Sequence, residues 1–247
     1  MRKVTSTEMQ NNFGKYLMMA QEEEIIITRN GQEIAKLGKV QPDFLADEAL
    51  HLSYGSTKTY EEFLEISRNS PERFELIDGE IVLLASPKTT HQLVVAELFA
   101  LLHSFLAEGT CLAIAAPYDI TIRRSPDDIN VVQPDLMVIC DLADHLDSEG
   151  YYQGVPTLIC EVLSESTRRI DLIKKMELYM TGGVKEYWVV DPENESILVY
   201  GFEEGDISRH MTYKAPDQAR SIVFPDLGVD LSSLFRKVKI SLGKNQG

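Results

Sequence analysis

Residues 133–139 read Gln-Pro-Asp-Leu-Met-Val-Ile, and residues 159–164 read Ile-Cys-Glu-Val-Leu-Ser. Both patterns are typical of buried β-strands, yet each carries a carboxylate, Asp135 in the first and Glu161 in the second. An unpaired carboxylate is unfavourable in a buried strand, so two of them require a partner, and a cation is the natural one. Oxygen ligands of this type suit Mg²⁺ or Mn²⁺.

The segment after these strands predicts a helix over residues 167–181. Asp171, Lys175 and Tyr179 lie at i, i+4 and i+8 in it, which places them along one face. Lys175 could then reach a substrate phosphate or the attacking water. The alternative is an exposed Asp171–Lys175 pair that contributes about 0.2–0.5 kcal/mol. Beside two strand carboxylates, we interpret the three residues as part of a site.

The periodicity of residues 59–240 predicts a mixed sheet flanked by helices, an α/β or α+β architecture. A helix opens this domain with the capping box Thr59-x-x-Glu62, and a longer one spans Thr89 to Ala107. We expect four residues of the longer helix to be buried: Leu93, Ala96, Leu101 and Phe105. Strands are expected at Arg73–Ile77, Glu80–Ala85, Cys111–Ala116, Asp119–Arg123, Val131–Ile139, Thr157–Leu163, Glu186–Val190, Ile197–Tyr200 and Arg209–Tyr213.

The first forty residues predict a separate small module. Ser6 or Thr7 can cap a helix reaching about Glu23. A hairpin follows, with its turn at Asn30-Gly31, between a strand at residues 25–28 and a return strand at residues 34–40. A unit of this size buries little surface alone, so we expect a homodimer. Residues 41–58 lack periodicity and are expected to form a linker.

Several short stretches carry a resemblance within residues 1–40: Val4-Thr5-Ser6-Thr7-Glu8, Asn12-Phe13-Gly14-Lys15-Tyr16-Leu17, Ile26-Ile27-Thr28-Arg29-Asn30-Gly31 and Ile34-Ala35. Together they resemble the Phd/YefM antitoxin DNA-binding module, which dimerises and contacts operator DNA. The resemblance implies DNA contacts, by position, from Arg2, Lys3, Asn11, Asn12 and Lys15. The alternative is a small structural appendage whose polar residues are merely solvated.

The second domain also carries a resemblance. The matching stretches are Phe74-Glu75-Leu76-Ile77-Asp78-Gly79-Glu80, His91, Gln133-Pro134-Asp135-Leu136, Glu161-Val162-Leu163-Ser164, Ser166-Thr167-Arg168, Asp171 with Lys175 and Tyr179, and Gly183-Val184-Lys185-Glu186-Tyr187-Trp188-Val189-Val190-Asp191-Pro192. They resemble the PD-(D/E)xK nuclease superfamily and, more closely, the Uma-two-type family of restriction-endonuclease-like proteins. The match spans about residues 58–235 and implies a restriction-endonuclease-like core.

The resemblance implies a catalytic set of Asp135, Glu161 and Lys175, with the two acids as metal ligands. The superfamily pattern expects a lysine two residues after the second acid, but Leu163 stands there. In the Uma-two-type family the lysine has moved to the following helix, where Lys175 fits and Lys174 is a weaker candidate. Glu75 and His91 are implied as auxiliary residues.

The charge distribution bears on any nucleic-acid contact. A net charge of −15 argues against a broad basic surface. Residues 1–40 hold six Lys/Arg against five Glu, a net +1 that leaves −16 for the remaining chain. We therefore expect generic DNA contacts in the N-terminal segment. The acidic remainder is compatible with a metal site, because a bound cation inverts the local field.

Three cysteines, Cys111, Cys140 and Cys160, are widely spaced and form no C-x-x-C pair. This predicts neither a disulfide framework nor a zinc site, so we expect buried free thiols in a reducing compartment. No apolar run is long enough to span a bilayer, and residues 5–12 are mostly polar. We therefore expect a cytoplasmic protein without membrane contact.

The sequence thus favours a Mg²⁺- or Mn²⁺-dependent endonuclease that hydrolyses phosphodiester bonds, with DNA as the expected substrate. One alternative is a non-enzymatic DNA-binding regulator that uses the nuclease fold as a scaffold. The net negative charge of the chain beyond residue 40 and the absence of a lysine at position 163 favour that alternative, while the complete acid–acid–lysine set argues against it. A third possibility is an antitoxin-like module fused to the effector that it restrains.

Overall fold

The computed structural model describes residues 2–5, 8, 19, 24–29, 32–37, 57–164, 167–168 and 170–243. The chain divides into two compact units, residues 1–47 and residues 48–247. Each unit is described by itself below. Within the described ranges, no helix is both long enough and apolar enough to cross a membrane.

The first unit contains a three-stranded sheet in the order β1-β2-β3. The predicted hairpin is confirmed as β2 (Ile25–Arg29) paired antiparallel with β3 (Gln32–Leu37). An unpredicted strand, β1 (Arg2–Thr5), pairs parallel with β2, so Arg2 and Lys3 belong to the sheet. Glu8 and Met19 are helical, and the rest of the expected first helix lies outside the described residues.

Among the described residues of this unit, the buried apolar side chains are Val4, Ile25 and Ile26. Met19 and Ile27 pack against Val4 and Ile25. The expected turn at Asn30-Gly31 and the expected linker up to residue 56 lie outside the described residues.

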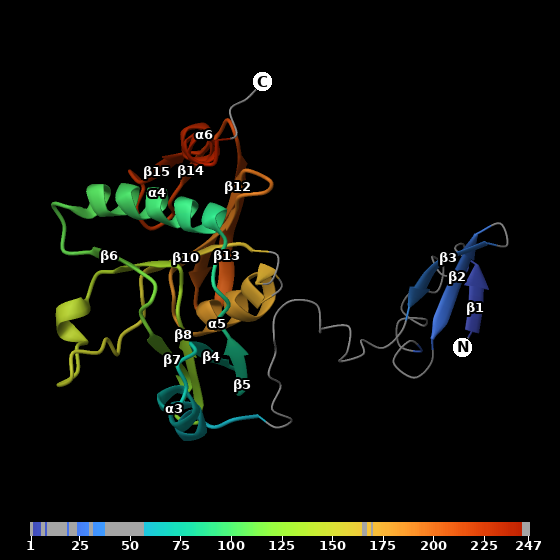
Figure 1. Cartoon of the computed structure of the whole chain (residues 1–247), viewed down its shortest axis with the longest axis horizontal. Helices are drawn as coiled ribbons and strands as arrows, with labels where there is room; N and C mark the ends of the chain where they lie inside the picture. Colours follow the sequence, from blue (N-terminus) through green and yellow to red (C-terminus); the bar gives the residue numbers. More distant parts are fainter. Residues whose placement is uncertain are drawn as a thin grey trace. The chain divides into compact units, whose positions relative to one another are not determined.

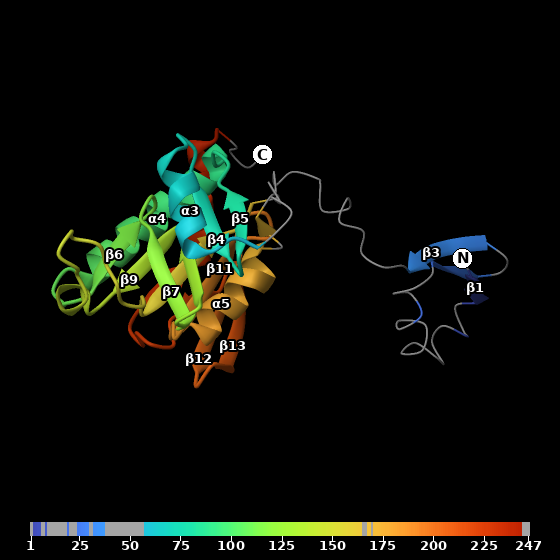
Figure 2. The same ribbon diagram turned by 90° about the horizontal axis from the view of Figure 1, so that it is seen from below.

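The second unit is built on two main sheets (Figures 1 and 2). A six-stranded mixed sheet has the order β13-β12-β11-β10-β9-β6, with β10 and β11 parallel and the other pairs antiparallel. Its strands are β6 (Leu112–Ala115), β9 (Leu136–Ile139), β10 (Leu158–Val162), β11 (Glu186–Asp191), β12 (Ser196–Glu203) and β13 (Asp206–Lys214). The mixed α+β class predicted from the sequence is therefore confirmed.

The second sheet has four antiparallel strands in the order β5-β4-β8-β7. They are β4 (Phe74–Ile77), β5 (Glu80–Leu83), β7 (Ile120–Ser125) and β8 (Asp128–Val132). Helix α3 (Tyr60–Arg68) precedes this sheet and packs Phe63 against it. The predicted capping box is confirmed, because Thr59 Oγ1 accepts from the Glu62 amide at 3.3 Å and Glu62 Oε2 accepts from the Thr59 amide at 2.9 Å.

The expected strand over residues 131–139 is wrong, since it is two strands in different sheets. β8 ends at Val132 and β9 begins at Leu136. Pro134 lies in the break, where it has no N–H to donate to a ladder. This break brings Asp135 to the junction between the two sheets.

Side chains of the six-stranded sheet alternate between two cores. On β10, Leu158, Cys160 and Val162 pack toward α4 (Thr89–Leu106) and α6 (Leu231–Ser241), which lie together over one face (Figure 1). Ile159 and Leu163 pack toward α5 (Met176–Thr181) and the four-stranded sheet. Because strand side chains alternate, Glu161 lies on the α5 side.

Helix α4 buries a different face from the one expected. Val94, Val95, Leu98, Leu102 and Leu106 are buried. The predicted residues are less covered: Leu93 and Leu101 are partly buried, Ala96 is exposed and Phe105 is 39% exposed. The apolar residues of this helix are spread around nearly all of its circumference, so their spacing in the sequence could not identify the buried face.

The C-terminal segment adds elements that the sequence did not predict. Strands β14 (Gln218–Arg220) and β15 (Gly228–Asp230) form a two-stranded sheet. Helix α6 follows directly, and Asp230 caps it by accepting a hydrogen bond from the Ser233 amide at 2.5 Å.

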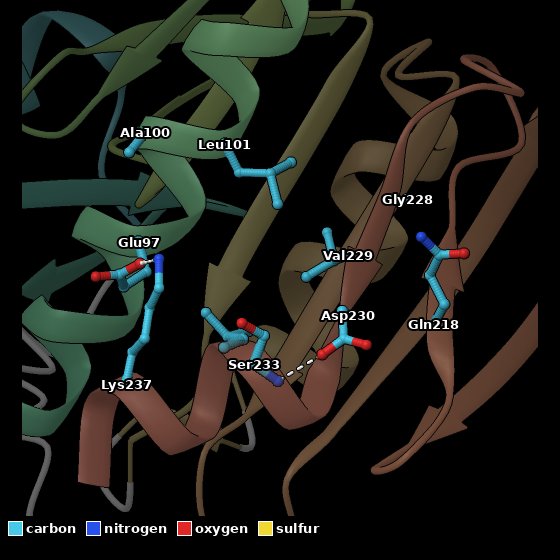
Figure 3. A pocket seen from close by; sticks show the side chains of 10 residues that line it. Glu97, Ala100, Leu101, Gln218, Gly228, Val229, Asp230, Ser233 and Lys237 are labelled. Carbon is cyan, nitrogen blue, oxygen red and sulfur yellow. Dashed lines mark hydrogen bonds and ion pairs between the residues drawn. The ribbon is translucent and has the colours of Figure 1, made fainter. Parts of the chain in front are cut away.

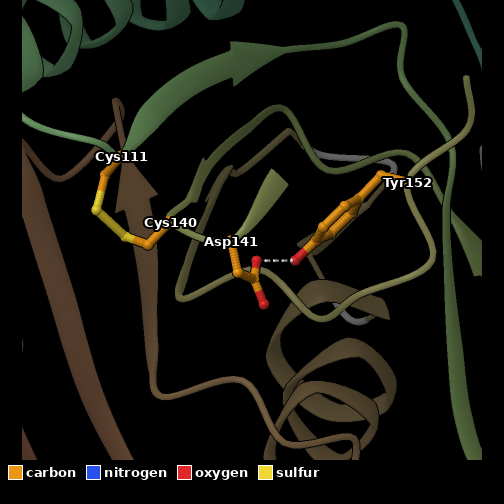
Figure 4. The surroundings of a disulfide bond; sticks show 4 residues. All are labelled: Cys111, Cys140, Asp141 and Tyr152. Carbon is orange, nitrogen blue, oxygen red and sulfur yellow. Dashed lines mark hydrogen bonds between the residues drawn. A yellow bond between two sulfur atoms is a disulfide. The ribbon is translucent and has the colours of Figure 1, made fainter. Parts of the chain in front are cut away.

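Cys111 and Cys140 form a disulfide, so the expectation of three free thiols is wrong for this pair (Figure 4). Strands β6 and β9 pair with Leu112 opposite Ile139, which places the two cysteines opposite each other just beyond the ladder. Their separation of 29 residues gave no sign of this in the sequence. Cys160 is free and buried, as expected. The cysteines therefore no longer argue for a reducing compartment.

Reducing this disulfide is expected to lower the free energy of unfolding by roughly 2–4 kcal/mol, because the bond restricts the unfolded chain. Urea unfolding with and without a thiol reductant measures the loss. Cys160→Ser provides a control, and reductant should shift its unfolding as it shifts the wild type. Cys111→Ser should match the reduced wild type, and a reductant effect that persists in this variant would contradict the assignment.

Candidate active site

A cavity of about 750 Å³ lies in the second unit, where the two sheets approach the N-terminus of α4. Its polar lining includes all five residues that the sequence predicted for this domain: Glu75, His91, Asp135, Glu161 and Lys175. They come from β4, α4, the start of β9, β10 and the segment before α5. The structure thus brings together residues that are up to 100 positions apart in the chain.

Asp135 is held by two donors on one of its oxygens. The Val162 amide donates to Asp135 Oδ2 at 2.8 Å, and His91 Nε2 lies 3.0 Å from the same oxygen. The Asp135 amide in turn donates to Glu161 Oε2 at 3.2 Å. The two acids are therefore neighbours, and the ends of β9 and β10 position them.

Glu161 is also held by two donors on one oxygen. Lys175 Nζ lies 2.9 Å from Glu161 Oε1, and the Tyr179 hydroxyl donates to the same oxygen at 2.7 Å. All three side chains are at most 5% exposed. The predicted approach of Lys175 to Glu161 is thus present in the structure.

Two further carboxylates surround the same lysine. Glu75 Oε1 lies 2.9 Å from Lys175 Nζ and also accepts the Gln133 amide at 2.8 Å. Asp171 Oδ1 lies 3.8 Å from Lys175 Nζ. No catalytic or metal-binding role was predicted for Asp171 and Tyr179 from the sequence, although their helical spacing predicted that they share one face with Lys175.

Residues Ile170–Lys175 form a π-helix, which leads directly into α5. The sequence predicted an uninterrupted α-helix here, and its spacing cannot reveal the wider turn. π-Helical turns are rare and occur often at functional sites. This one buries Asp171 and Lys175, while Lys174 lies at the surface and pairs with Glu80. Lys174 is therefore not the lysine of the site.

Burial and charge shift the ionisation of this cluster. Burial raises the pKa of Glu161 well above its usual range, and Lys175 opposes that rise only in part. Burial likewise raises the pKa of Asp171 to about 6, against the opposing charge of Lys175. Burial favours neutral Lys175, but the Glu161 and Glu75 charges outweigh it and raise its pKa well above the usual value. Lys175 therefore stays cationic.

The ionisation of His91 is shifted by a neighbouring carboxylate, as that of Lys175 is. Burial disfavours the charged imidazolium, but the hydrogen bond and charge of Asp135 outweigh burial and raise the pKa of His91 above its usual value. A histidine with a raised pKa beside a carboxylate holds that carboxylate in one orientation.

The donor set fits a divalent cation of the Mg²⁺ type. Among the described residues, no three His, Cys, Asp or Glu side chains form a ready-made metal cluster. Mg²⁺ does not need one, because it keeps several waters and takes one or two protein carboxylates. Four carboxylates line the cavity together with four basic side chains, and two of these carboxylates, Asp135 and Glu161, are adjacent and can offer oxygens to one cation.

A second cavity, of about 440 Å³, lies between α4, β15 and α6 (Figure 3). Its charged side chains already have partners. Lys237 pairs with Glu97 at 2.8 Å, and Asp230 caps α6. Without a cluster of buried acids, this cavity does not resemble a catalytic site.

The residues predicted to contact DNA belong to the first unit. Arg2 and Lys3 are exposed on β1. Asn11, Asn12 and Lys15 lie outside the described residues. These DNA contacts therefore stay predictions.

Comparisons with known proteins bear on the second unit. A solved structure from Anabaena variabilis ATCC 29413, titled as a "putative nuclease belonging to DUF820", matches with a TM-score of 0.59 at 19% identity, covering 73% of this chain and 98% of that one. At this identity the match shows a shared fold.

Two proteins of Synechocystis sp. (strain ATCC 27184 / PCC 6803 / Kazusa) are related in sequence. One, "Uncharacterized protein slr1290", is 26% identical over 64% of this chain and 81% of its own length. Another, "Uncharacterized protein sll1609", is 28% identical over 54% of this chain and 74% of its own length. The model of the Uma2 family, described as "Putative restriction endonuclease", matches residues 60–232. The chain therefore belongs to the Uma2 family, as its resemblance to the Uma-two-type proteins implied.

Proposed function

We propose that this protein is a metal-dependent endonuclease that hydrolyses phosphodiester bonds in DNA. The observation that carries the proposal is the meeting of Asp135, Glu161 and Lys175 in one cavity, with Lys175 Nζ 2.9 Å from Glu161 Oε1. Membership of the Uma2 family supports a nuclease role. The metal dependence and the DNA substrate are proposed in addition to what family membership supports.

In this mechanism Asp135 and Glu161 would hold Mg²⁺ or Mn²⁺. A cation bound there would supply Lewis acidity, which would lower the pKa of a bound water and stabilise negative charge on the phosphate. Lys175 stays protonated and offsets the charge that develops on the phosphate oxygens. His91 keeps Asp135 oriented through the 3.0 Å contact. Arg73 and Lys88 also line the cavity and add positive charge near the substrate.

We further propose that the first unit binds DNA and dimerises the protein in the cytoplasm. Two observations support this part: Arg2 and Lys3 are exposed on one strand, and the unit spans only residues 1–47. A unit of this size buries little surface alone and gains stability when it packs against a second copy.

The test is cleavage of supercoiled, linear and single-stranded DNA with Mg²⁺ or Mn²⁺, for the wild type and Asp135→Asn. The substitution removes a negative ligand but keeps the side-chain shape, so activity should fall at least about 100-fold. Chelation with EDTA should abolish wild-type cleavage. Equal background cutting by both proteins, with DNA binding retained, would instead favour the non-enzymatic regulator.

A further inference from the structure

Each of the two metal-holding acids has one oxygen saturated by hydrogen bonds and one left available. A carboxylate oxygen accepts about two hydrogen bonds. Glu161 Oε1 already has two donors, Lys175 at 2.9 Å and Tyr179 at 2.7 Å. Among the residues that the structure describes, the Asp135 amide is the only donor to Glu161 Oε2, at 3.2 Å.

Asp135 shows the same division. Its Oδ2 has two partners, the Val162 amide at 2.8 Å and His91 Nε2 at 3.0 Å. Its Oδ1 accepts no hydrogen bond from the residues that the structure describes. The free lone pairs of the two acids are therefore on Asp135 Oδ1 and Glu161 Oε2, which belong to neighbouring carboxylates.

We propose that Tyr179 and His91 are positioning residues, each of which occupies one oxygen of an acid and thereby presents the other oxygen to the cation. This rests on the proposed function. The division of roles assigns Asp135 Oδ1 and Glu161 Oε2 as the cation-binding atoms. Carboxylates that hold a metal commonly need such hydrogen-bonded support to keep their orientation.

Tyr179 is well suited to this role because its ring cannot move away. The residue is fully buried, and its ring packs edge-to-face against Tyr187 with a centroid distance of 5.1 Å. Its hydroxyl donates to Glu161 Oε1 at 2.7 Å. Lys175 shares the same oxygen, but its amine is divided between Glu161 and Glu75.

The chain offers a matched control in Tyr187. This tyrosine is equally buried, and its hydroxyl donates to the backbone carbonyl of Asp171 at 3.0 Å, rather than to a carboxylate. Tyr187→Phe and Tyr179→Phe thus each remove one buried hydroxyl from the same ring pair. Only Tyr179→Phe removes a hydrogen bond from Glu161.

The test is Mn²⁺ binding by isothermal titration calorimetry, with the full chain and without DNA. Tyr179→Phe should bind Mn²⁺ roughly tenfold or more weakly, while Tyr187→Phe should bind like the wild type. In cleavage assays, Tyr179→Phe should raise the Mn²⁺ concentration for half-maximal activity more than it lowers the rate at saturating Mn²⁺. Thermal unfolding confirms that each variant is folded.

His91 gives an independent arm if Tyr179→Phe does not fold. His91→Ala should weaken Mn²⁺ binding roughly tenfold, and His91→Gln, which can still donate to Asp135, should recover part of it. Wild-type affinity in folded Tyr179→Phe, or an equal loss in Tyr187→Phe, would overturn the positioning role while the nuclease proposal stands. A wild type that binds no Mn²⁺ would overturn both.

Discussion

Lys175→Met is expected to lower the free energy of unfolding by roughly 3–5 kcal/mol at neutral pH without divalent cations, because it leaves buried carboxylates without their cation. Lys175 Nζ lies 2.9 Å from both Glu75 Oε1 and Glu161 Oε1 and 3.8 Å from Asp171 Oδ1. All of these groups are at most 5% exposed, so water cannot replace the lost charge. Urea unfolding in EDTA measures the effect.

The loss should depend on pH in a defined direction. Asp171 has a pKa raised from 3.8 to about 6 by burial, while Lys175 holds it down. A carboxyl whose folded pKa is raised contributes stability below the unfolded value, and this contribution disappears as pH rises through the folded pKa. Without Lys175 the pKa of Asp171 rises further. The deficit of Lys175→Met should therefore be small near pH 4 and grow through pH 6.

Lys174→Met is the control, because the neighbouring lysine makes only a partly exposed pair with Glu80. Such surface pairs contribute about 0–1 kcal/mol. Equal stability of the two variants at pH 8 would show that the buried cluster does not depend on Lys175. Cleavage by folded Lys175→Met should also fall at least about 100-fold, because the group opposite the developing charge is lost.

Much of the second unit could be predicted from sequence because local patterns dominate it. Alternating and continuous apolar runs placed nearly all its strands, and Thr59-x-x-Glu62 placed the start of α3. The errors arose where local pattern does not determine the answer. Pro134 marks the break between two sheets, but the apolar residues on both sides of it resemble one continuous strand in the sequence. The Cys111–Cys140 bond follows from strand register, which the sequence does not state.

The site was predictable to the extent that unusual chemistry is visible in a sequence. A carboxylate in an apolar strand is conspicuous, which identified Asp135 and Glu161. The spacing of Lys175 from Asp171 suggested a shared face, and both are buried. The division of oxygens within each carboxylate could not be predicted, because it depends on tertiary hydrogen bonds from Tyr179 and other distant residues.

Glu186 shows that a carboxylate in an apolar strand does not by itself indicate a metal ligand. It is another fully buried glutamate in an apolar strand, on β11 next to β10. Its side chain belongs to the opposite face from Glu161, with Trp188. Five donor contacts satisfy it: Trp188 Nε1 at 2.5 Å, the Ser221 hydroxyl at 2.7 Å, the Ile222 amide at 3.0 and 3.1 Å to its two oxygens, and the Val223 amide at 2.7 Å. A carboxylate so fully bonded anchors the chain and leaves no lone pair for a metal.

Glu161→Gln and Glu186→Gln should therefore have opposite effects. Glu161→Gln should reduce cleavage at least about 100-fold, because the amide removes charge from the cation site. Its stability should change less than that of Glu186→Gln, since the new NH₂ group faces one described donor, the Asp135 amide, while the amide oxygen can still accept from Lys175 and Tyr179. Glu186→Gln should lower the free energy of unfolding by roughly 3 kcal/mol, because the new NH₂ group meets buried donors.

Cleavage per folded Glu186→Gln molecule should stay at the wild-type level. Urea unfolding and initial cleavage rates, measured on the same preparations, separate the two effects. Loss of cleavage in folded Glu186→Gln would mean that its anchoring of residues 221–223 reaches the cavity. If Glu161→Gln cleaved DNA at the wild-type rate, Glu161 would have no role in the reaction. Its contacts with Lys175 and Tyr179 would then serve the structure alone.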